Sequence, residues 1–225
     1  VRLFEIGRVF LLRESALEQP HRIAAVSTGR RFSEHWDGKS ENLDFYDIKQ
    51  LVEKIISINA LSYDEVIPAQ NAVLHPGRSI AYMTGEQCIA EAGLMHPQLV
   101  QKLGLKTPPA MLEIALPDAL VLPTPSFTPF SKFPAVRRDI SIVLDEDIAA
   151  GRVLALCKLA GGDLLRDLQL FDVFRGQGID SDKKSLALGL IFQASSRTLT
   201  EDEIETSVQR VLKRLAKDLG ATLRE

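Results

Sequence analysis

Basic side chains gather at the expected ends of strands from residue 131 onward. Arginine and lysine pair with phosphate or carboxylate, and the guanidinium of arginine also stacks on flat rings. The residues in question are Lys132, Arg137, Arg138, Arg175, Lys183, Lys184 and Arg197. The two ends of a sheet differ in space, so these residues cannot all form one anion-binding patch. The alternative is that the charges are only solvated.

The charge of the chain as a whole does not favour a polyanionic partner. The formal net charge of the 225 residues is −3, and residues 131–225 hold 15 Lys or Arg against 15 Asp or Glu. Long-range attraction to nucleic acid needs a net positive field. Any nucleic-acid role must therefore depend on a local patch.

Sequence patterns for catalysis or metal binding are missing. The chain has no Gly-x-x-x-x-Gly-Lys phosphate loop and no Gly-x-Ser-x-Gly nucleophile elbow. None of the four histidines lies at metal-ligand spacing from a cysteine. Cys88 and Cys157 are each in an apolar stretch and are predicted to be buried free thiols. These observations favour a binding module over an enzyme.

Residues 131–225 have the pattern of a ferredoxin-like βαββαβ domain. Thr200 and Glu203 form a predicted capping box at the start of the last helix, and Gly220 ends that helix. The predicted elements are strand 139–144, helix 149–160, strand 164–174, strand 185–194, helix 201–219 and strand 221–224.

The third of these strands predicts a sheet with two different faces. Leu186, Leu188, Leu190 and Phe192 alternate with small or polar residues and are expected to face the helices. The open face then carries Ser185, Gly189 and Gln193, with Ser141 from the first strand. Such a face suits close approach of a flat partner, or is simply solvated or covered by the linker. No exposed pair of aromatic side chains is predicted on it, in contrast to an RNA-recognition motif.

The first half has a mixed, mostly antiparallel α+β pattern. Asp44 is predicted to cap a helix that runs to about Asn59 and buries a face containing Ile48, Leu51 and Val52. Strands are expected at 3–12, 23–28, 79–83, 88–95 and 111–116, and a short helix at 97–103. Five prolines between 117 and 134 indicate an extended linker. The sequence therefore predicts two domains, 1–125 and 126–225.

Short motifs along the whole chain resemble the beta subunit of bacterial phenylalanine–tRNA ligase. The most specific are Phe133-Pro134-Ala135-Val136-Arg137-Arg138-Asp139 and Leu170-Phe171-Asp172-Val173-Phe174-Arg175-Gly176. The others, in the same order as in the family, begin at Leu3, Asp44, His75, Gly93, Lys184 and Arg197.

The resemblance implies a different role for each of the two domains. Residues 126–225 would be the ferredoxin-fold anticodon-binding domain. Residues 1–125 would be the trailing part of a class II synthetase-like domain without catalysis, and the chain indeed has no Phe-Arg-x-Glu strand. The family assembly is an alpha2 beta2 heterotetramer in the cytoplasm, with no membrane contact, that uses ATP and magnesium to attach phenylalanine to tRNA(Phe). No catalytic residue, metal or cofactor is expected in this part of it.

The resemblance also implies roles for single residues. The candidates for tRNA contact are Arg137, Arg138, Ser141, Arg175, Lys183, Lys184, Ser185, Gly189, Gln193 and Arg197. Asp139 is alternatively a carboxylate that fixes Arg138, and Phe171 is interpreted as a core aromatic. Trp36 and the four phenylalanines of the first half are also expected in the core. The alternative function is a scaffold that docks on a partner subunit without touching the anticodon.

Overall fold

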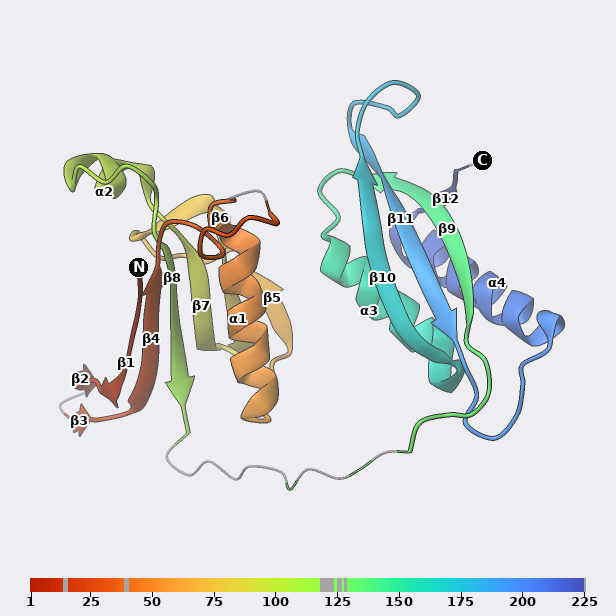
Figure 1. Ribbon diagram of the computed structural model, residues 1–225, viewed down its shortest axis with the longest axis horizontal. Helices are drawn as coiled ribbons and strands as arrows, with labels where there is room; N and C mark the ends of the chain where they lie inside the picture. Colours follow the sequence, from red (N-terminus) through yellow and green to blue (C-terminus); the bar gives the residue numbers. More distant parts are fainter. Residues whose placement is uncertain (14–15, 39–40, 118–123, 125–126, 128, 225) are drawn as a thin grey trace. The chain divides into compact units, whose positions relative to one another are not determined.

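The computed structural model describes residues 1–13, 16–38, 41–117, 124, 127 and 129–224 (Figure 1). The chain divides into two compact units, Val1–Pro125 and Ser126–Glu225. Pro123 and Pro125 of the expected linker lie outside the described residues. Each unit has its own hydrophobic core and its own main antiparallel sheet, which agrees with the predicted α+β class.

The first unit is built on a six-stranded antiparallel sheet in the order β1-β4-β8-β7-β6-β5. A short hairpin, β2 with β3, separates β1 from β4. The strands are β1 Arg2–Arg8, β2 Leu11–Arg13, β3 Ala16–Glu18, β4 His21–Ser27, β5 Glu65–Ile67, β6 Leu74–Thr84, β7 Gln87–Met95 and β8 Ala110–Leu116.

Helix α1 (Phe45–Ile58) packs against the middle of this sheet, over β6, β7 and β8. The predicted cap is confirmed, because the Asp44 carboxylate accepts from the backbone of the first turn in a capping box. Ile48 and Val52 are buried, but Leu51, expected beside them, is 39% exposed at the edge of the apolar stripe. The short helix α2 (Pro97–Lys102) begins at a proline, as predicted.

Five aromatic side chains of this unit were expected in its core, and for four of them this prediction is wrong. Trp36 is 95% exposed, and Phe4, Phe10 and Phe32 are also exposed. Phe4 lies opposite Ala25 on the edge strand β1, where α1 does not reach. Of these five side chains, Phe45 packs against the core. Cys88 was also expected to be buried, but it is exposed.

The second unit confirms the βαββαβ prediction. Its antiparallel sheet has the order β10-β11-β9-β12, and α3 and α4 lie together on one face of it (Figure 1). The elements are β9 Val136–Asp145, α3 Ala150–Gly161, a 3-10 turn Gly162–Leu164, β10 Leu165–Phe174, β11 Lys183–Phe192, α4 Glu201–Leu219 and β12 Thr222–Leu223.

Strand β11 decides the two faces of this sheet. Leu186, Leu188, Leu190 and Phe192 are each at most 1% exposed and pack with the apolar stripe of α4 in the core. The capping box of Thr200 and the left-handed Gly220 delimit α4 as expected. The core therefore occupies the helical side and leaves the other face of the sheet open.

Candidate nucleic-acid interface

The open face of the second unit has small residues along its central strands. Ser185 and Gly189 of β11 lie beside Val143 and Asp139 of β9. The hydroxyl oxygens of Ser141 and Ser185 are 3.1 Å apart and share a hydrogen bond. Ser185 is only 2% exposed, so its side chain supports the sheet and offers little surface to a ligand.

An arginine lies across this small-residue floor. The Arg137 guanidinium carbon is 5.1 Å from the centroid of the Phe171 ring, and its Nε donates to Asp139 Oδ1 at 2.7 Å. A Cβ on Gly189 would come within 2.9–3.0 Å of the guanidinium. The absence of a side chain at Gly189 therefore leaves the room that Arg137 occupies. Asp139 fixes Arg137, whereas the sequence had suggested Arg138.

Two phenylalanines of β10 point to the same open face, which corrects the sequence interpretation. Phe171 is 52% exposed and Phe174 is 36% exposed, so Phe171 is not a core residue. The register between β10 and β11 shifts by one residue between Leu170 and Asp172. This β-bulge interrupts the period-2 alternation, which would otherwise place Phe171 and Phe174 on opposite faces.

A second arginine, Arg224, also lies on this face, although no sequence pattern singles it out. The backbone N–H of Arg224 donates to the Ser141 carbonyl at 2.8 Å, so its strand continues along β9. The Arg224 guanidinium carbon is 4.9 Å from the centroid of the Phe174 ring on the opposite edge strand. We call Arg137, Phe171, Phe174 and Arg224 the arginine–phenylalanine face.

The candidates at the Arg137 end of the sheet are engaged in contacts inside the unit. Arg138 pairs with Glu201, and Arg197 makes two charged hydrogen bonds with Glu203, at 2.5 and 2.6 Å. Both carboxylates belong to the first turn of α4. Gln193 Nε2 donates to the Phe133 carbonyl at 2.7 Å. These side chains hold the start of α4 and the entry to β9 in place.

The candidates at the opposite end are likewise bound within the unit. Arg175 pairs with Glu146 at 2.7 Å, and this contact lowers the pKa of the Glu146 carboxyl. Lys183 lies 3.6 Å from Asp180. Lys184 is 7% exposed and its ammonium donates to the Glu146 carbonyl at 2.6 Å, so an RNA contact through its side chain does not fit its burial. Of the predicted basic residues, Arg137 lies over the small-residue floor of the open face, beside Gly189.

The ion pair of Arg197 with Glu203 should make the stability of the second unit depend on pH. The hydrogen bonds from Arg197, together with the one from the Thr200 backbone N–H, lower the pKa of the Glu203 carboxyl from 4.5 to about 2. A lowered folded-state pKa contributes stability above pH 4.5, and that contribution is lost as pH falls from 4.5 toward 2. We expect Glu203→Gln to flatten the fall in melting temperature over this range, as measured by calorimetry. Glu205→Gln on the same helix is the control, and an equal flattening there would contradict the assignment.

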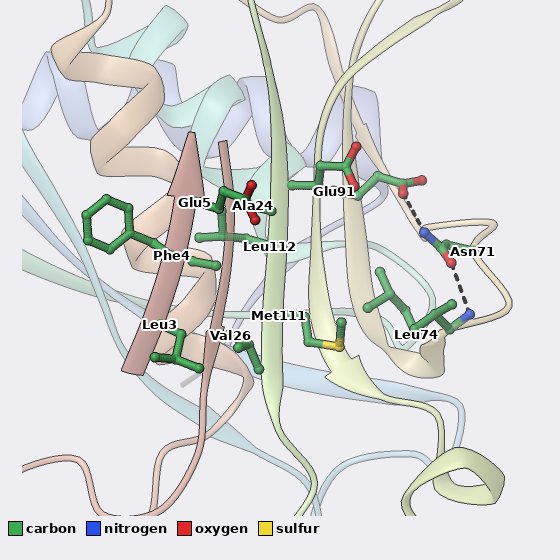
Figure 2. Close-up of a pocket in the computed structure, with 13 residues that line it drawn as sticks. Leu3, Phe4, Glu5, Ala24, Val26, Asn71, Leu74, Glu91, Met111 and Leu112 are labelled. Carbon is green, nitrogen blue, oxygen red and sulfur yellow. Dashed lines mark hydrogen bonds between the residues drawn. The ribbon is translucent and has the colours of Figure 1, made fainter. Parts of the chain in front are cut away.

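A hollow of about 440 Å³ lies over the sheet of the first unit (Figure 2). Asn71 donates to Glu91 at 2.8 Å and accepts from the Val73 backbone N–H at 3.0 Å (Figure 2). Glu113 also lines the hollow, lies opposite Glu91 in register, and pairs with Arg22. With Glu5, three carboxylates line this space.

A model of a known protein family matches each of the two units. The model of the phenylalanyl tRNA synthetase beta chain CLM domain matches residues 1–116, more than half of the chain. The chain belongs to the phenylalanyl tRNA synthetase beta chain family. The ferredoxin-fold anticodon binding domain model matches residues 131–224, which include the whole arginine–phenylalanine face.

Curated relatives match the full length of the chain. Phenylalanine–tRNA ligase beta subunits from Methylococcus capsulatus and Pseudomonas putida are each 39% identical, and that of Colwellia psychrerythraea is 41% identical. Each match covers 100% of this chain but only 28% of the relative. A solved pyrrolysyl tRNA synthetase from Desulfitobacterium hafniense aligns at 16% identity and a TM-score of 0.35, over 51% of this chain and 38% of that one, which supports no inference.

Within the described residues, no group of three or more His, Cys, Asp or Glu side chains is arranged to hold a metal ion. No helix in the described parts of the chain is long and apolar enough to cross a membrane.

Proposed function

We propose that the second unit binds the anticodon region of tRNA(Phe) and that the chain serves a phenylalanine–tRNA ligase as a non-catalytic part of its beta subunit. The observation that carries this proposal is the match of the anticodon-binding model to residues 131–224. The arginine–phenylalanine face supports it, because guanidinium and aromatic planes stack on unpaired bases while arginine also pairs with phosphate.

The whole ligase would attach phenylalanine to tRNA(Phe) in the cytoplasm, using ATP and magnesium held elsewhere in an alpha2 beta2 assembly. The exposed Leu3, Phe4 and Ile6 of β1 support a role of the first unit in subunit contact.

Binding to matched RNAs tests the anticodon assignment. We expect the chain to bind tRNA(Phe) at low salt and to bind a transcript that lacks the anticodon stem-loop at least about tenfold more weakly, because stacking and phosphate contacts would be lost. Filter binding over a range of salt concentrations measures both affinities. Equal affinity for the two RNAs, or no binding to either at low salt, would refute the assignment of the second unit to the anticodon region.

A further inference from the structure

The two arginine–phenylalanine contacts of the open face are held in different ways. Arg137 is fixed by the carboxylate of Asp139 at 2.7 Å and fits closely over Gly189. Arg224 is exposed, and within the described residues no carboxylate pairs with it. The contact between Arg224 and Phe174 is therefore the more easily broken of the two.

The ring of Phe174 lies at a suitable place for a second flat ligand. It is opposite Ser185 in register, and Ala187 follows on the same face of β11 opposite Ser141. These side chains are small, and the guanidinium of Arg224 lies over the Phe174 ring, with its carbon 4.9 Å from the ring centroid. If Arg224 turned away, the exposed face of the ring would become available without any movement of the backbone.

We propose that Phe174 and Arg224 form a gated stacking site for one unpaired nucleotide. In the free unit the guanidinium covers the ring; on binding, the base stacks on Phe174 and Arg224 turns to the adjoining phosphate. Stacking on an aromatic ring and a charged bond to phosphate together replace one exposed cation–π contact. The inference rests on the proposed RNA-binding function and adds a second, movable site beside the fixed Arg137 platform.

Nuclear magnetic resonance of arginine side chains tests the movement directly. The 225-residue chain, labelled at arginine, is titrated with the tRNA(Phe) anticodon stem-loop. In the free chain the ring of Phe174 shifts the side-chain protons of Arg224 upfield, and Phe174→Leu identifies this signal by abolishing the shift. We expect saturation with RNA to abolish the same shift in the unchanged chain, while the corresponding shift of Arg137 over Phe171 persists.

Two comparisons separate this inference from the function on which it rests. A stem-loop with abasic residues in place of the anticodon bases should leave the Arg224 shift in place, because no base displaces the guanidinium. Phe174→Leu should lower affinity for the intact stem-loop by about tenfold, the effect of one lost stacking contact. If the RNA binds and the Arg224 shift stays unchanged, the gated site is refuted and the proposed function stands. If no RNA binds at all, both fall.

Discussion

Arg137→Gln is expected to weaken binding of the chain to the tRNA(Phe) anticodon stem-loop by about tenfold to a hundredfold. The change removes a planar cation that is already held in place over Phe171 and Gly189, so little ordering is required when RNA binds. The loss of one stacking platform corresponds to roughly 1–3 kcal/mol. The slope of affinity against salt should also become shallower by about one phosphate contact.

Two further variants separate charge from shape at this position. Arg137→Lys keeps the positive charge but loses the flat guanidinium, so we expect it to restore the salt slope and not the affinity. Arg214→Gln, which removes an arginine that pairs with Asp218 on α4, is the control and should leave both quantities unchanged. Unchanged affinity and salt slope in Arg137→Gln would contradict a role for Arg137 in binding RNA.

Much of the second unit follows from local sequence signals. The Thr200 capping box, the left-handed Gly220 and the alternation of Leu186, Leu188 and Leu190 each depend on a few neighbouring residues, and the structure confirms them. These signals fix the helical face of the sheet. By elimination they also identify the open face and two of its residues, Ser141 and Gly189, whereas Arg137 was expected only at the entry to the first strand.

The rest of the candidate interface depends on contacts between distant residues. The β-bulge at β10 changes the side to which Phe174 points, and no residue type in that strand marks it. Arg224 reaches Phe174 only because β12 and β10 belong to one sheet. The burial of Lys184 likewise depends on the Glu146 carbonyl, which is 38 residues away in sequence.

The first unit shows why an apolar pattern does not by itself predict burial. Phe4 of β1 lies opposite Ala25, which packs against the core, but burial of Phe4 also requires another element to cover that position. Helix α1 is too far from the edge strand to do so. Periodicity therefore predicts which face a residue shares, and the arrangement of the other elements decides whether that face is covered.

Phe192→Ala is expected to cost the second unit about 3–5 kcal/mol, the range for removing a large aromatic side chain from a packed core. Phe192 is fully buried at the end of β11 and packs in the cluster that joins both helices to the sheet. Unfolding in urea, followed by circular dichroism, measures the loss. Leu159→Ala, which shortens a side chain that is 69% exposed on α3, should change the free energy of unfolding by no more than about 0.5 kcal/mol.

The same change links the core to the open face. Strand β11 carries Phe192 and Leu190 on its helical side and Gly189, the floor beneath Arg137, on the other. A loss of this size is a large part of the 5–15 kcal/mol that stabilises a typical domain. We therefore expect Phe192→Ala to weaken RNA binding at temperatures where the unit begins to unfold, and to restore it on cooling. A loss of binding in the fully folded variant would show instead that the core position of Phe192 sets the geometry of the open face directly.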